Sequence, residues 1–157
     1  MKNKLFIILL LFLTSCGYSA IYKNKDSNNL LINIIGMQGD ADMNNLINNE
    51  LELYSNQDSD NKFDLNINTA YEKKIISKNT SGAASSYQLS AKVEFIITNK
   101  DKKEKILFVE RFNIENDPDS FAQKSYEDII KRNFANSIRE KLILKLSSFK
   151  WSLNLMI

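Results

Sequence analysis

The 157-residue sequence has no histidine, one cysteine, one proline and four glycines. Without histidine, both the commonest general acid-base of enzymes and the commonest metal ligand are missing. One cysteine cannot form an internal disulfide or a zinc site built from several thiolates. No Gly-rich phosphate loop and no serine in a nucleophile elbow occur. The sequence therefore argues against an enzyme, because each carboxylate is explained as a cap, a turn residue or part of a hydrated strand face.

The chain also lacks a strong net charge. Lysine and arginine number 21 against 19 aspartates and glutamates. Two of the lysines, Lys2 and Lys4, lie in a segment that we expect to be removed, which leaves 19 against 19. A neutral domain lacks the basic surface typical of phosphate-backbone binding, so nucleic acid is not an expected partner. The 43% of hydrophobic and 25% of charged residues are typical of one ordinary folded domain.

The first sixteen residues have the layout of a bacterial lipoprotein signal. A basic start precedes nine apolar residues (5–13), too few for a spanning helix of about 20 residues. Residues 13–16 (LTSC) match a lipobox, whose cysteine is acylated on sulfur and then on its new amino group. The alternative, a buried core segment, would leave a free thiol in an oxidising periplasm. We therefore expect covalent lipid on Cys16, no other cofactor, and an anchored chain that does not span the membrane.

Four segments follow from this interpretation. The residue after Cys16 is Gly17 and not aspartate. In lipoproteins, the absence of aspartate at this position favours sorting to the outer membrane. The mature chain has the size of a single domain. Residues 149–157 are unusually apolar for a chain end, and either cap the core or contact a partner. The predicted segments are a signal peptide (1–15), a lipidated N-terminus and polar tether (16–29), one α+β domain (30–148) and an apolar C-terminal tail (149–157).

The first half of the domain predicts a strand and a short helix. Residues 30–35 are apolar or β-branched and end at Gly36, which is typical of a buried strand. Asp40 is placed to cap the following helix. Residues 57–62 form a polar loop that lacks the glycine and closing glutamate of a calcium site. The predicted helix has one apolar face, formed by Met43, Leu46, Ile47, Leu51 and Tyr54.

Three further strands are predicted from alternating polarity. Residues 63–71 and 87–97 alternate with the period of strands that have one hydrated face, and residues 105–114 complete a hairpin around a charged turn at 99–104. Residues 77–86 are small or polar. Because they can add little to a core, we expect an exposed loop.

A long helix ends the domain. Asp117 is the expected cap, Pro118 the expected first helical residue, and the helix runs to about Ser147. Its apolar stripe steps by four residues and so drifts by roughly 40° per step. Either the helix follows its sheet, or its C-terminal half meets a second surface. The stripe consists of Tyr126, Ile130, Phe134, Ile138, Leu142 and Leu146.

The order β-α-β-β-β-α predicts an α+β fold with a small mixed four-stranded sheet. Both helices need one covering layer, so we expect them on the same face of the sheet. The other face is mixed in polarity, with Gln88, Ser90, Lys92 and Glu94 beside Leu107 and Val109.

The chain resembles the lipopolysaccharide-assembly outer-membrane lipoprotein family, LptE. The resemblance rests on residues 13–18 (LTSCGY), on residues 84–89 (ASSYQL) after the small-residue loop, and on residues 111–113 (RFN) followed by residues 120–122 (SFA) and a long helix. It covers nearly the whole mature chain. Each motif is short, and their order behind a lipobox carries the similarity.

The resemblance implies a protein that plugs and helps to assemble a large outer-membrane β-barrel translocon, which delivers lipopolysaccharide to the cell surface. It implies a lipid-anchored domain that faces the periplasm or the barrel lumen. A neutral, mixed surface suits the polar interior of such a barrel. The alternative is an accessory lipoprotein of another periplasmic lipid-transport or envelope-integrity system, which would keep the anchor and differ in its partner.

Two candidate sites follow for these partners. Lipopolysaccharide carries phosphate and carboxylate groups, for which Lys73, Lys74, Lys78 and Arg111 are the candidate donors. Alternatively, the lysines are ordinary solvated side chains of a Lys-rich chain, and Arg111 pairs with a nearby glutamate. The loop from Ser77 through Gly82 to Ser86, together with the C-terminal part of the long helix, is the candidate barrel contact.

The anchor can be tested by Cys16→Ala. We expect this variant to lose tight membrane association, because the nine-residue apolar run is too short to anchor the chain as a helix. Fractionation of membranes measures the change. A full-length variant that stays tightly membrane-bound would contradict the lipoprotein interpretation.

Overall fold

The computed structural model describes residues 30–154 except 56–58, 60 and 101, and describes side chains up to residue 149. The predicted signal peptide, Cys16, the tether and residues 155–157 lie outside this range. Within the described part of the chain, no helix is both long enough and apolar enough to cross a bilayer.

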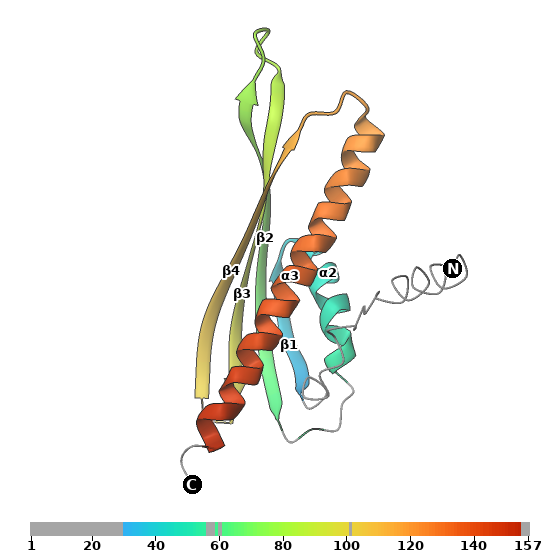
Figure 1. The fold of residues 1–157 in the computed structure, drawn as a ribbon. Helices are drawn as coiled ribbons and strands as arrows, with labels where there is room; N and C mark the ends of the chain where they lie inside the picture. Colours follow the sequence, from blue (N-terminus) through green and yellow to red (C-terminus); the bar gives the residue numbers. More distant parts are fainter. Residues whose placement is uncertain (1–29, 56–58, 60, 101, 155–157) are drawn as a thin grey trace, which may run out of the picture.

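A four-stranded sheet in the order β1-β2-β3-β4 forms the centre of the domain (Figure 1). The first two strands run parallel, and the other pairs are antiparallel. The predicted mixed sheet and the order β-α-β-β-β-α are confirmed. The elements are β1 (Leu31–Gly39), α2 (Ala41–Leu51), the short 3-10 helix η2 (Glu52–Tyr54), β2 (Lys62–Lys78), β3 (Ala84–Asn99), β4 (Lys102–Glu115) and α3 (Ser120–Asn154).

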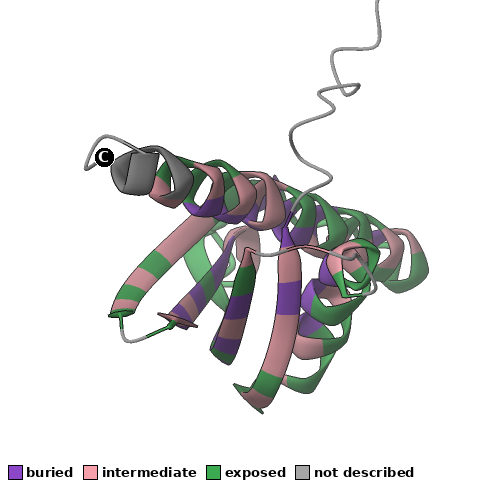
Figure 2. Cartoon of the chain, turned by 90° about the horizontal axis from the view of Figure 1, so that it is seen from below, coloured by how far each residue is buried: buried purple, intermediate pink, exposed green. Residues whose placement is uncertain are grey.

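Both helices cover one face of this sheet, as predicted, and the core lies between the helices and the sheet (Figure 2). Alternate residues of each strand point to opposite faces, so one residue in two reaches the core. In β3 these residues are Leu89, Ala91, Val93, Phe95 and Ile97, all at most 2% exposed. We call the opposite surface the open face.

The first strand is longer than predicted, because Gly36 does not end it. Between Ile34 and Gly36 the register shifts, and the extra residue, Ile35, is exposed. Pairing then continues to Gly39, which has a positive φ of 99°. A Cβ atom at Gly39 would lie 1.8 Å from the carbonyl oxygen of Thr69, so only glycine allows this close approach.

The predicted exposed loop 77–86 is mostly strand, and this part of the prediction is wrong. The strand β2 continues to Lys78 and β3 begins at Ala84, so only residues 79–83 form the turn. Ser77 pairs with Ser86. Small side chains that bury little are compatible with an exposed hairpin arm, because its backbone groups bond across the pair.

The long helix begins two residues later than predicted. The carboxylate of Asp119 accepts from the backbone N–H groups of Phe121 and Ala122, so Asp119 is the cap. The carboxylate of Asp117 accepts from the N–H of Asp119 and closes a turn before the helix. Pro118 therefore precedes the helix instead of opening it.

The predicted helical stripe is buried from Ile130 to Leu146, where its residues are at most 6% exposed, but its first residue, Tyr126, is 46% exposed. The helix therefore follows its sheet, which is the first of the two alternatives above. It runs to Asn154, past the predicted end near Ser147. Phe149 lies at the start of the predicted tail and packs 6.3 Å from Phe63, ring centroid to ring centroid, so this part of the tail joins the core.

Candidate functional site

The domain has two different ends. The distal end carries the β2–β3 turn (79–83) and the start of α3, and the paired arms of the hairpin project beyond the rest of the sheet (Figure 1). The proximal end carries the start of β1, the start of β2, the β3–β4 turn and the C-terminal part of α3.

Large apolar side chains are exposed near the distal end. Ile75 and Ile76 lie in the hairpin, and Phe112 lies near the end of β4. Phe112 also lines a groove with Ala122 and Tyr126 of the long helix. Exposed apolar side chains that gather in one region commonly mark a contact with a protein or lipid partner. The exposed set is Ile75, Ile76, Phe112, Phe121, Tyr126 and Ile129.

The predicted contact loop lies at the tip of this end. The hydroxyl of Ser77 lies 2.6 Å from that of Ser86, across the two strands. Gly82 has a φ of 84°, and a Cβ atom there would meet nothing within 4 Å. These residues are brought together as one protruding hairpin. The C-terminal part of α3, which the sequence analysis adds to this contact, lies at the proximal end, so the structure does not bring it together with the hairpin (Figure 1). Contact of the hairpin with a barrel stays a prediction.

A polar network connects the hairpin to the long helix. Lys73 makes an ion pair with Glu127 of α3, and its ammonium lies 4.1 Å from the centroid of the Tyr87 ring. Gln123 is buried, donates to Glu127 at 2.9 Å and accepts from the backbone N–H of Asp117 at 2.7 Å. Because Lys73 is occupied in this way, it is not available as an anion donor without losing its partner.

The neighbouring Tyr71 lies in an unusual environment. Its hydroxyl is buried and has no hydrogen-bond partner among the described residues. Burial, with the nearby carboxylates of Glu127, Asp128 and Asp40, raises the pKa of Tyr71 to about 12. The ammonium of Lys131 lies 4.7 Å from the ring centroid.

The open face holds the other predicted cations. Lys74 is adjacent to Lys73 on β2, and alternation directs the two side chains to opposite faces, so the predicted lysine cluster is divided. Arg111 lies opposite Ser90, which lies opposite Glu72 on the next strand. In the described part of the chain, neither Lys74 nor Arg111 forms an ion pair. Lys78 is exposed at the end of β2.

Sequence reasoning missed one neighbour of Arg111. Lys92 and its partner Val109 occupy the next open-face row, so Arg111 and Lys92 are close diagonal neighbours. The alternation of β3 assigns Lys92 to the hydrated face, but only the register reveals this proximity. Further along, Leu107 lies opposite Glu94 and is 57% exposed. Cationic and apolar side chains therefore lie side by side on the open face.

The described residues contain no cluster of side chains that could hold a metal ion. No group of three aspartates, glutamates, cysteines or histidines comes together among them. The surfaces with distinctive chemistry are the distal apolar end and the open face with its cations.

Comparison with known proteins identifies the family. Residues 28–146 match the family model described as LptE, lipopolysaccharide-assembly. The chain belongs to this family, as the sequence resemblance predicted. It is accordingly a lipoprotein of lipopolysaccharide transport and outer-membrane assembly, and the lipoprotein family indicates anchoring at the outer membrane.

Solved structures share the fold at low sequence identity. Rare lipoprotein B from Shewanella oneidensis is 15% identical with a TM-score of 0.60, over 80% of this chain and 98% of that one. A putative lipoprotein from Caulobacter crescentus is 13% identical with a TM-score of 0.54, over 81% and 93% of the two chains. A minor lipoprotein from Acinetobacter baumannii is 13% identical with a TM-score of 0.52, over 77% and 95%. No curated protein sequence matches the chain.

The pKa of Tyr71 predicts a stability change at high pH. Between pH 10, where the unfolded tyrosine ionises, and about 12, only the unfolded state loses this proton, so the folded state loses stability as pH rises. Tyr71→Phe removes this loss. We expect the wild-type free energy of unfolding to fall by about 1–2 kcal/mol more than that of Tyr71→Phe over this window, allowing for partial exposure.

Urea unfolding at several pH values measures this difference. Tyr126→Phe is the control, because it removes a hydroxyl from an exposed ring at the distal end. Equal pH dependence in wild type and Tyr71→Phe would show that this tyrosine ionises as freely when folded as when unfolded.

Proposed function

We propose that this lipoprotein is anchored to the outer membrane through lipid on Cys16 and enters a large β-barrel lipopolysaccharide translocon as its plug. There it assists assembly of the barrel and delivery of lipopolysaccharide to the cell surface. Family membership supports the transport role. The distal hairpin and the exposed apolar residues around it are the proposed barrel contact.

The observation that carries this proposal is the exposed apolar chemistry of the distal end. Phe121, in the first turn of α3, is 80% exposed, and Ile75 and Ile76 of the hairpin are 46% and 44% exposed. Solvent exposure of several large apolar side chains in one region is unfavourable for a free domain. Burial against a partner removes this cost, and a projecting hairpin can reach into a concave surface.

The rest of the surface suits the inside of a barrel. The open face presents Asn66, Asn68 and Gln88 together with charged residues, and barrel interiors are polar. Such a surface can exchange bound water for hydrogen bonds to a lumen with little loss of solvation. A domain that exposes apolar side chains around a projecting hairpin and many polar side chains along one sheet face fits a plug.

We also propose that the open face contacts lipopolysaccharide through Lys74, Lys92 and Arg111. Lys78, at the end of β2, belongs to the same set. Arginine can bind a phosphate through two parallel N–H donors, and lysine adds a point charge. The exposed Leu107 beside these cations suits the acyl part of the same amphiphile. Lys73 is left out of this set because it pairs with Glu127.

The barrel contact is tested by Phe121→Asp. The carboxylate cannot be buried unpaired against a partner, so we expect a loss of co-purified barrel of about tenfold or more. Leu144→Asp is the matched control, since Leu144 is also an exposed apolar residue of α3 (72%) and lies far from the distal end. Purification in mild detergent, with identification of the partner by mass, measures the effect.

Two results would contradict the plug proposal. One is retention of the barrel by Phe121→Asp at the level of Leu144→Asp. The other is co-purification of a periplasm-spanning lipid-transport complex without a barrel, which would favour an accessory role in another system.

Direct lipopolysaccharide contact is tested by the double substitution Lys92→Gln and Arg111→Gln. We expect the affinity of the purified lipoprotein for labelled lipopolysaccharide to fall about five- to tenfold for each lost charge. Lys124→Gln with Arg132→Gln is the control, because these residues are exposed on the long helix. Unchanged binding in the open-face variant, or an equal fall in both variants, would rule out this binding surface.

A further inference from the structure

We propose that the free edge of β4 binds an extended, acidic segment of the barrel protein, which pairs with it as an additional strand of the sheet. This inference rests on the proposed plug function and adds how the barrel is recognised. Backbone hydrogen bonds along β4 would hold a segment of the barrel protein that lies inside the lumen.

The backbone of β4 carries hydrogen-bonding groups that point away from the rest of the sheet. The strand lies at one edge (Figure 1), and no strand of the described chain pairs with its outer side. Asn116, directly after β4, donates its backbone N–H to the carbonyl oxygen of Ser85 on the β3 side, at 3.0 Å. Backbone groups of successive residues in a strand point alternately to its two sides. The odd-numbered residues from Lys103 to Glu115 therefore direct their N–H and C=O groups to the free edge.

Of the two edges of the sheet, β4 is the regular one. It pairs with β3 residue by residue over its whole length of 14 residues, without a register shift. The other edge strand, β1, has nine residues and is interrupted between Ile34 and Gly36. Short length and bulges are devices that prevent an edge from pairing with a further strand. Because β4 has neither, it is the edge that can accept one.

The strand also exposes apolar side chains on both faces of the sheet. Leu107 is 57% exposed on the open face, and Phe112 is 42% exposed on the opposite face. Phe112 lines the distal groove with Ala122 and Tyr126, and the groove has a volume of about 530 Å³. Side chains of an added strand would lie about 5 Å from those of β4. They can therefore cover Leu107 and Phe112, while the backbone bonds supply affinity.

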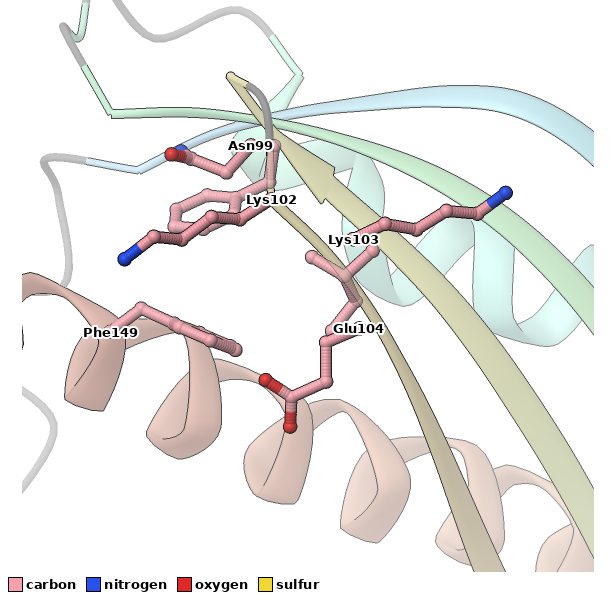
Figure 3. Close-up of a pocket in the computed structure, with 7 residues that line it drawn as sticks. Asn99, Lys102, Lys103, Glu104 and Phe149 are labelled. Atoms are coloured by element: carbon pink, nitrogen blue, oxygen red, sulfur yellow. The ribbon is translucent and has the colours of Figure 1, made fainter.

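The charges of β4 select the chemistry of the added segment. Three of its seven charged residues are paired with residues of β3 or α3: Lys105 with Glu94, Glu104 with Lys145 and Glu110 with Lys141. The other four are Lys102, Lys103, Arg111 and Glu115, three cations and one acid, which no ion pair engages within the described residues. Lys102 and Lys103 extend in different directions from the start of the strand, while Glu104 turns toward the helix (Figure 3).

This excess of positive charge distinguishes between possible occupants. A second copy of the edge would bring the same excess, and like charges on paired strands are destabilising. Lysines on an edge strand are a recognised device against such self-pairing. An acidic segment, by contrast, would neutralise the edge.

The position of β4 points to the barrel protein as the source of this segment. Phe112 belongs both to β4 and to the exposed apolar set that we propose as the barrel contact, so a segment on this edge would continue that contact. Strands in a closed barrel wall are already paired on both sides. The donor is therefore a segment that projects from the wall into the lumen. Because the pairing uses the backbone, the side chain of Arg111 stays available on the open face.

Photocrosslinking in the full-length lipoprotein, co-expressed with the barrel protein, tests where the segment lies. A photoreactive amino acid replaces Leu107, beside the free edge. The matched control carries it at Ile35, which is equally exposed (57%) but lies on the other edge strand. After purification in mild detergent, we expect mass spectrometry to identify an acidic peptide of the barrel protein crosslinked at position 107 and not at position 35.

Val109→Pro tests the backbone pairing. Proline removes the N–H that residue 109 directs to the free edge and leaves the bonds between β3 and β4 in place, an arrangement that edge strands tolerate. We expect the amount of co-purified barrel to fall about fivefold. Val109→Thr is the matched control, because it keeps both the N–H and the β-branched shape. Urea unfolding of both variants verifies that they are folded, and the crosslink at position 107 tests the edge without proline.

Three results would overturn the edge proposal and leave the plug proposal standing. The first is a barrel that co-purifies without a crosslink from position 107, or with an equal crosslink from position 35. The second is a crosslink from position 107 to another copy of this chain. The third is retention of the barrel by a folded Val109→Pro variant at the level of Val109→Thr. Absence of the barrel from the wild-type purification would overturn the plug proposal, and this inference with it.

Discussion

The register of the long β2–β3 hairpin is the constraint on which the rest of the structure depends. It pairs Asp64 with Thr98 at one end and Lys78 with Ala84 at the other, and it assigns every side chain in between to a face. A slip of one residue would move the core residues of β3 to the open face. The same pairing carries the hairpin past the end of β4 and so creates the distal end.

Long-range polar contacts then hold the helices to this sheet. The hydroxyl oxygen of Thr69 lies 2.8 Å from the side-chain amide of Asn44 and 3.0 Å from the carbonyl oxygen of Asp40, and these polar contacts join the start of α2 to β2. The ion pair between Lys73 and Glu127 joins the hairpin to α3, and the ion pair between Lys145 and Glu104 joins α3 to β4 at the opposite end. Ion pairs therefore lie near both ends of α3, while its buried apolar stripe packs on the sheet between them. The two ends of the domain differ in chemistry, because exposed large apolar side chains gather at the distal end and exposed lysines lie around the β3–β4 turn.

The candidate cations illustrate how far sequence reasoning reached. Lys73, Lys74 and Lys78 are close in sequence and form the predicted cluster, yet the alternation of a strand directs Lys73 and Lys74 to opposite faces of the sheet. That separation is readable from the sequence once the strand is known to continue to Lys78. The proximity of Lys92 to Arg111 cannot be read from the sequence in this way, because it depends on the register between β3 and β4. Nor does an apolar residue such as Phe121 reveal, from its type alone, whether it is buried or exposed.

The sequence by itself determined the lipoprotein signal, the order of elements, the mixed sheet with both helices on one face, and the family resemblance. These features depend on local chemistry: a basic and apolar start before a cysteine, a period of two in strands and of 3.6 in helices, and short motifs in order. Tertiary structure decided the bounds of β1 and β2, the helix cap at Asp119, the ion pair of Lys73 with Glu127 and the grouping of cations on the open face. The physical reason is that the length of a strand and the partners of its side chains depend on pairing with segments distant in the chain. The register of that pairing cannot be read from one segment alone.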